Sequence, residues 1–176
     1  FVLFLLIGYF ILRWRESGVP QEPKLTPASA AALTVSGLRN ATYRTADCGN
    51  ITMQNGVYEP ADPNARCSVS LLDKIAIGDL NGDGSSDAVV FLGVDLGGSG
   101  FFVSLAAVVN RDGTPEHIAS IALEDRIKID DVSIEAGTVR LAATVHSGAA
   151  PMCCPDSAVL WHFRLAQDSL VRLPGR

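Results

Sequence analysis

Residues 88–109 read AVVFLGVDLGGSGFFVSLAAVV, two almost wholly apolar runs on either side of a glycine-rich segment. Short apolar runs bounded by turn residues are typical of strands that are buried on both faces. We therefore predict that residues 88–92 and 101–109 form central strands of a sheet. The glycines at 97–100 predict a turn or bulge and not a phosphate-binding loop, because a strand follows them and no Lys-Ser/Thr pair does.

The rest of the chain after Leu33 alternates with period two. Asn55-Gly56 lies between residues 51–54 and 57–59, and this dipeptide is the strongest short-range signal for a β-hairpin. Further strands are expected at 68–78, 88–94, 101–110, 117–123, 127–135, 138–146 and 159–165, with turns at 111–113, 135–137 and 166–169. Because short connections join antiparallel neighbours, we predict an all-β fold: an antiparallel meander that forms a curved sheet, a partial barrel or a sandwich.

Length and composition exclude several classes of protein. The 176 residues suffice for one domain with a short appendage. Apolar residues make up 48% and charged residues 19%, which excludes a disordered chain. Lys and Arg number 14 against 19 Asp and Glu, and no basic stripe exists, so general nucleic-acid binding is not expected.

The N-terminal residues predict a membrane segment. Residues 1–12 (FVLFLLIGYFIL) carry no charge and are followed by Arg13-Trp14-Arg15. Twelve helical residues cover about 18 Å of a bilayer core of about 30 Å, so we expect a single transmembrane helix over 1–15 that begins before Phe1. A buried hydrophobic helix or a retained signal segment is the alternative. Residues 16–32, with three prolines, predict an extended linker to an extracytoplasmic β-domain at 33–176.

Residues 79–87 (DLNGDGSSD) place oxygen-bearing side chains at alternate positions. Calcium takes six to eight oxygen ligands, and such a spacing aims them inward around a tight turn at Gly84. The alternative is that Asn-Gly and Asp-Gly merely form turns. Three carboxylates within nine residues repel one another unless a cation is present, so we predict a structural Ca²⁺ site. Its ligands would be the side chains of Asp79, Asn81, Asp83 and Asp87 and the carbonyl oxygen of Ser85.

The loop resembles the calcium-binding hairpins of FG-GAP repeats in integrin-type propellers, in which the ninth-position Asp completes the coordination shell. It differs from an EF-hand, because the twelfth position is Val90 and strands flank it. A wider pattern, GDLNGDG at 78–84, DAVV at 87–90, GGSG at 97–100 and MCCP at 152–155, is similar to uncharacterised secreted or lipid-anchored bacterial domains. The similarity covers about residues 72–165 and implies an exported location and a fold, but no reaction.

Four cysteines in an exported domain predict disulfides. Cys48 and Cys67 flank the Asn55-Gly56 turn and are expected to bridge neighbouring strands. Cys153 and Cys154 would then form a vicinal disulfide, which is either a rigid clip or a redox switch. Crossed pairing of the N-terminal cysteines with this pair stays open.

These features together predict a non-catalytic accessory subunit in the bacterial inner membrane. A single pass through the lipid would hold the β-domain in the periplasm or outside the cell, docked on a larger membrane protein complex such as a photosynthetic or respiratory assembly. Arg13 and Arg15 alone would favour the opposite orientation. No small-molecule substrate is expected.

Two alternatives remain from the same residues. One is a periplasmic redox or soft-metal protein; its residues would be His146, Met152, Cys153, Cys154 and His162. The other is a carbohydrate or cell-wall binder that uses Trp161 and Tyr58 as platforms.

Overall fold

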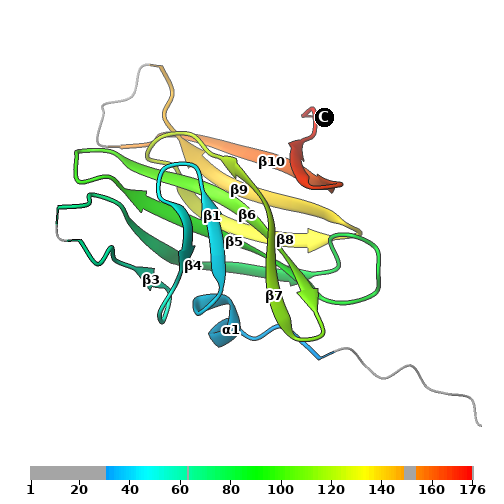
Figure 1. Ribbon diagram of the computed structural model, residues 1–176. Coiled ribbons are helices and arrows are strands. Elements are labelled where there is room, and N and C mark those ends of the chain that lie inside the picture. The colour runs from blue at the N-terminus through cyan, green and yellow to red at the C-terminus, as the bar shows by residue number, and fades with distance from the viewer. Residues whose placement is uncertain (1–30, 63, 149–153, 176) are drawn as a thin grey trace, which may run out of the picture.

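The computed structural model describes residues 31–62, 64–148 and 154–175, and within them the chain is almost entirely β-structure. One short helix, α1, precedes eleven strands (Figure 1). The elements are α1 (Val35–Arg39), β1 (Thr42–Thr45), β2 (Gly49–Thr52), β3 (Val57–Tyr58), β4 (Ser68–Gly78), β5 (Asp87–Asp95), β6 (Phe101–Arg111), β7 (Thr114–Ala122), β8 (Lys128–Glu135), β9 (Thr138–Val145), β10 (Ser157–Ala166) and β11 (Ser169–Arg172). The predicted all-β class is confirmed.

The strands form two antiparallel meanders and a small hairpin. One sheet has the order β3-β4-β5-β6-β7, the second has the order β11-β10-β9-β8, and β1 pairs with β2. Tight turns join β6 to β7, β8 to β9 and β10 to β11, and they contain residues with positive φ: Asp112 (φ 53°), Ala136 (φ 47°) and Gln167 (φ 54°). Positive φ in a hairpin turn matches the twist of the flanking strands. The turns expected at 111–113, 135–137 and 166–169 are therefore confirmed.

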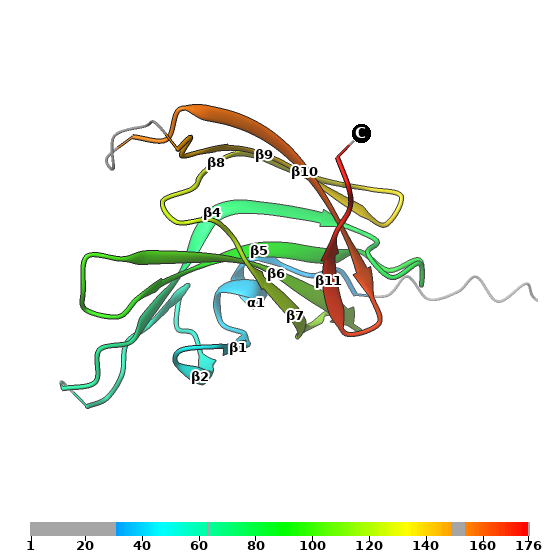
Figure 2. The same ribbon diagram turned by 90° about the horizontal axis from the view of Figure 1, so that it is seen from above.

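The five-stranded sheet is covered on both faces, as the apolar runs at 88–92 and 101–109 predict. Eight of the nine residues of β5 are buried, and β6 is buried from Leu105 to Asn110. The four-stranded sheet covers one face and forms the first core with it, around Phe91, Leu141 and Phe163. The second core lies on the other face, beneath α1 and β1–β2 (Figure 2).

The Asn55-Gly56 turn is present, but the strands around it pair differently from the prediction. Gln54 and Val57 form one isolated bridge across the turn, with Asn55 at φ 55° and Gly56 at φ 88°. Beyond this bridge β2 pairs with β1, while β3 pairs with β4. The reason is burial, because pairing β1 with β2 directs Tyr43 and Ile51 together into the second core.

The two sheets approach each other closely where β4 ends. A Cβ atom on Gly78 would lie 2.8 Å from the Cβ of Ile134 in β8, which is closer than two such atoms approach. Glycine at this position therefore allows β4 and β8 to meet at one side of the sandwich. This contact places the loop that follows β4 beside the β8–β9 turn.

The disulfide between Cys48 and Cys67 is present, with the Cα atoms 5.7 Å apart. It ties the end of the β1–β2 hairpin to the segment before β4 and excludes the crossed pairing. Cys154 is also disulfide-bonded, and its partner lies outside the described residues. Cys153, which was predicted to form a vicinal disulfide with Cys154, lies outside them too. The predicted anchor at 1–15 and nearly all of the linker at 16–32 also lie outside them. Among the described residues, no helix is long and apolar enough to cross a bilayer.

Candidate functional site

The acidic loop, residues 79–86, joins β4 to β5 at one end of the sandwich. Leu80 is 3% exposed and packs into the first core, so the loop is held to the domain by its second residue. Asp83 and the glycines beside it are exposed, whereas Asp87, the first residue of β5, is completely buried. The five predicted calcium ligands thus lie in one segment but differ widely in their access to solvent.

Most of the oxygen-bearing side chains accept hydrogen bonds from the main chain of the loop itself. The two carboxylate oxygens of Asp79 accept the N–H groups of Gly82 at 2.7 Å and Gly84 at 3.0 Å. Asn81 Oδ1 accepts the N–H of Asp83 at 2.8 Å, and the amide of Asn81 donates to Asp83 Oδ2 at 2.9 Å. These bonds hold the loop in its tight conformation.

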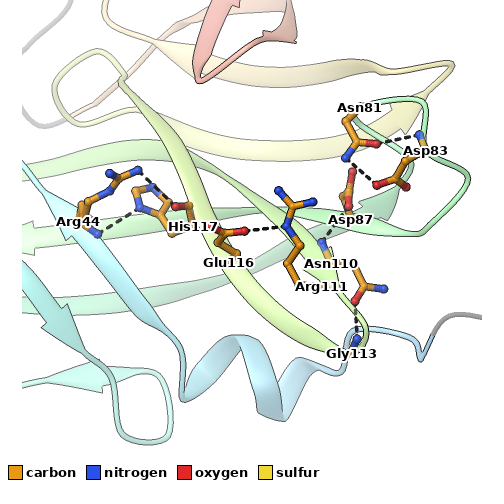
Figure 3. A network of polar contacts seen from close by, with 9 residues as sticks. All are labelled: Arg44, Asn81, Asp83, Asp87, Asn110, Arg111, Gly113, Glu116 and His117. Carbon is orange, nitrogen blue, oxygen red and sulfur yellow. Dashed lines mark hydrogen bonds and ion pairs between the residues drawn. The ribbon is translucent and has the colours of Figure 1, made fainter.

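Asp83 is an ionised, exposed carboxylate. Its Oδ1 accepts the N–H of Ser85 at 2.7 Å. This main-chain bond, followed by the bond from Asn81, lowers the pKa of Asp83 below its ordinary value, with a small further lowering from the Arg111 guanidinium. Arg111 in turn forms an ion pair of 2.7 Å with Glu116 (Figure 3).

Asp87 connects the loop to the neighbouring strand. Its Oδ2 accepts the N–H of Leu80 at 3.0 Å, and its Oδ1 accepts the N–H of Asn110, the penultimate residue of β6, at 2.9 Å (Figure 3). A buried carboxylate requires such partners because desolvation without them is costly. The ninth position of the loop is therefore a cross-link between the loop and two strands.

Asn110 extends this network to Ala31, the first described residue. Its side chain is 5% exposed; the amide donates to the carbonyl of Ala31 at 2.8 Å, and Oδ1 accepts the N–H of Gly113 at 2.7 Å. The β6–β7 turn and the first described residue of the chain are thus bonded to one side chain. Only its bond to Gly113 is local; its other partners, Ala31 and Asp87, lie 79 and 23 residues away, so local sequence gives no signal for these contacts.

The donor set of the loop suits calcium in its chemistry, because all its candidate ligands are oxygens. An ion would use the second lone pairs of oxygens that already accept N–H groups. Within the described part of the chain, however, no group of three or more His, Cys, Asp or Glu side chains converges on one point. Asp79 and Asp83 are bonded within the loop, while Asp87 is directed to Leu80 and Asn110.

A cleft of about 550 Å³ separates the acidic loop from the second sheet. Its lining comes from Asp79 and Asn81 in the loop, Ile134 in β8, Gly137 in the β8–β9 turn and Arg164 in β10. Arg164 donates to the hydroxyl of Thr138 at 3.3 Å. The lining thus combines a carboxylate, a guanidinium and apolar side chains such as that of Leu80.

His146 and His162, from the soft-metal alternative, and Trp161, from the carbohydrate-binder alternative, lie on or next to β9 and β10. Nε2 of His146 is buried and has no hydrogen-bond partner among the described residues. His162 lies in the middle of β10 opposite Arg140. Trp161 is 6% exposed, beneath the guanidinium of Arg172 at 4.1 Å, so it is not an exposed platform for a sugar.

No family model matches this chain, and no curated protein or solved structure matches it either.

Proposed function

We propose that this chain is a non-catalytic, membrane-anchored accessory subunit whose β-domain docks on a larger membrane protein complex outside the cytoplasm. In this proposal residues 1–15 cross the lipid, residues 16–32 form the tether, and a calcium ion stabilises the acidic loop. The function of the loop is then to make the attachment point of the tether rigid.

The observation that carries the proposal is the bond between Asn110 and the carbonyl of Ala31. This bond fixes the entry of the chain to the same side chain that holds the β6–β7 turn. Through the N–H of Asn110 and the carboxylate of Asp87, the entry point is coupled to the acidic loop. A domain that moves freely on a flexible linker does not need a fixed attachment at Ala31. A domain that is held in one orientation beside a partner does need one.

An oxidising compartment is supported by the Cys48–Cys67 disulfide, because such bonds persist in exported domains and are rare in the cytosol. The polar groups of the site support a positioning role. Asp79, Asp83 and Asp87 all accept main-chain N–H groups and thereby shape the loop.

The proposal is tested by isolating the tagged full chain from its native membranes in a mild detergent. We expect it to migrate within an assembly larger than a monomer, and we expect removal of residues 1–15 to release the domain from the membrane. Asn110→Ala is expected to make the tether more sensitive to protease and to weaken retention in the assembly, while Asn64→Ala, at an exposed loop residue, leaves both unchanged. A full chain that migrates alone at every step contradicts the proposal.

A redox role is the second candidate, because Cys154 is disulfide-bonded and the imidazole of His146 has a buried nitrogen without a partner. The double change Cys153→Ser and Cys154→Ser separates the two functions. Loss of thiol exchange with a small disulfide favours the redox role, whereas a lowered melting temperature alone favours a structural clip.

A further inference from the structure

His117 lies in β7 at the place where β1 crosses over the five-stranded sheet. Its Nδ1 accepts the main-chain N–H of Arg44 at 3.1 Å (Figure 3). Its Nε2 lies 2.8 Å from the hydroxyl of Ser120. A ring nitrogen that accepts an N–H carries no proton, so the single proton of the neutral imidazole is on Nε2 and is donated to Ser120. The observed contacts therefore require a neutral imidazole.

Arg44 supplies the remaining polar contacts between the same two strands. Its guanidinium donates to the carbonyl of His117 at 3.4 Å and to that of Ile118 at 2.9 Å. These bonds and the bond to Nδ1 join β1 to the outer edge of β7. The attachment of the β1–β2 hairpin at this edge therefore depends on the pair Arg44 and His117.

The surroundings of the imidazole disfavour a positive charge. From β1, Tyr43 packs against it with ring centroids 5.6 Å apart, but its phenol is neutral and donates to the carbonyl of Leu38. On β6 the residue opposite His117 is Val108, and on β7 the carboxylate of Glu116 is bound to Arg111.

The four-stranded sheet brings the remaining charged group, Arg172, near β7. β11 packs against β7 there, and its Arg172 stacks on Trp161. Among the described residues, the charge that faces the ring is thus the guanidinium of Arg44, which opposes an imidazolium.

We propose that His117 is an acid-sensitive latch that holds the β1–β2 hairpin on the five-stranded sheet. A proton on Nδ1 removes the acceptor and turns an N–H toward the N–H of Arg44, so the bond between the strands is lost. The Cys48–Cys67 disulfide keeps the β1–β2 turn, just beyond Arg44, attached to the segment before β4. Opening is therefore local, and it uncovers the second core where Tyr43 and Ile51 lie.

The direction of the pKa shift of His117 agrees with this geometry. Burial, and then the Arg44 guanidinium, lower the pKa of His117 below its ordinary value of 6.5, while a bond to the main chain of Ala119 acts in the opposite direction. The closed state therefore binds fewer protons than the open state. The stabilisation is present above about pH 6.5 and is lost as the pH falls through the lowered pKa of the closed state.

Hydrogen exchange measured by mass spectrometry on the full chain tests the latch. After correction for the intrinsic effect of pH, we expect a peptide containing residues 42–45 to exchange at least about threefold faster at pH 5 than at pH 7.5. A peptide from β9 (Thr138–Val145) in the second sheet serves as internal control and should not change.

His117→Asn keeps an acceptor for the Arg44 N–H but does not titrate, so it should remove the acid response. His162→Asn in β10 is the matched control and should retain it. Exchange of the imidazole C2 proton, followed in the same chain, gives the pKa of His117 directly. The latch is overturned by a pKa at or above 6.5, by an unchanged 42–45 peptide, or by an equal acid response in His117→Asn. If that variant does not fold, the wild-type chain provides the test. The pH midpoint of the His117 titration should then equal the pH midpoint at which exchange of the 42–45 peptide accelerates, and different midpoints overturn the proposal.

Discussion

The buried carboxylate of Asp87 accepts the main-chain N–H of Asn110 at 2.9 Å, and this bond joins the acidic loop to the strand that receives the N-terminal chain. The other carboxylate oxygen accepts the N–H of Leu80, so each oxygen of Asp87 faces a main-chain donor. This position therefore requires an acceptor at both oxygens.

Asp87→Asn is accordingly expected to destabilise the domain by about 2–3 kcal/mol, because the amide NH₂ must face one of two buried N–H donors. Urea unfolding monitored by circular dichroism measures the change. Asp73→Asn is the matched control: its carboxylate is 98% exposed and pairs with Arg39 at 3.5 Å, so a change within about 0.5 kcal/mol is expected. Equal stability of the two variants would show that the Asp87 cross-link contributes nothing.

Gly78→Ala is expected to destabilise the sandwich by about 1–3 kcal/mol, because the added methyl group overlaps Ile134 at the β4–β8 contact. Gly98→Ala has open space around the new methyl group and should change the free energy of unfolding by less than about 0.5 kcal/mol. Thermal unfolding of both variants makes the comparison. A Gly78→Ala variant as stable as Gly98→Ala would mean that the sheets do not meet there.

Much of this fold could be predicted because its signals are local. Period-two apolar patterns locate the strands from β4 to β10, and turn residues such as Asp112-Gly113 separate them. The pairing of β2 was wrong, because the choice between β1 and β3 depends on which apolar side chains reach the second core. The short strands β1 and β11 and the helix α1 were missed, since four or five residues carry too little periodicity to be recognised.

The position of the acidic loop between two strands was predicted, while the calcium site within it stays a prediction. The spacing of Asp79, Asn81, Asp83 and Asp87 locates the loop, and all four side chains lie at one end of the sandwich. That Asp87 points into the interior was not predicted, although an acid that directly precedes the apolar run 88–92 is a signal for it. Asn110 and His117 were missed, because their contacts with Asp87 and Arg44 join segments far apart in the sequence.

The double change Cys48→Ser and Cys67→Ser is expected to lower the free energy of unfolding by about 3 kcal/mol. The reason is that it removes a cross-link between residues 19 positions apart, which restricts the unfolded chain. Reduction of the wild-type domain should have a similar effect. Unfolding in urea with and without reductant provides the measurement. Reductant should then leave the double variant nearly unchanged; a large further loss would assign the effect to the disulfide of Cys154.

Acid is expected to weaken the contact between β8 and β9 at Asp130. Its carboxylate accepts hydrogen bonds from Lys128 at 2.8 Å and from the hydroxyl of Thr144 at 2.7 Å, and these bonds, in that order, lower the pKa of Asp130 below 3.8. The folded state thus binds fewer protons, so the stabilisation is present above about pH 4 and is lost as the pH falls through the folded pKa.

Unfolding midpoints between pH 5 and pH 2.5 should therefore fall less steeply in Asp130→Asn than in the wild type, with Thr144→Val in between. An identical slope in all three chains would contradict this assignment.

Calcium is expected to raise the melting temperature of the domain. An ion that binds only the folded state stabilises it by about 2.7 kcal/mol at a concentration of 100 times its dissociation constant, which corresponds to about 5–10 °C for a domain of this size. Asp79→Asn and Asp83→Asn should each reduce the shift, because each replaces a carboxylate by an uncharged amide, and Asp73→Asn should retain it. Magnesium should be less effective, because it gives up its water reluctantly. A melting temperature that neither millimolar calcium nor a chelator alters would leave the loop as a turn held by its own hydrogen bonds.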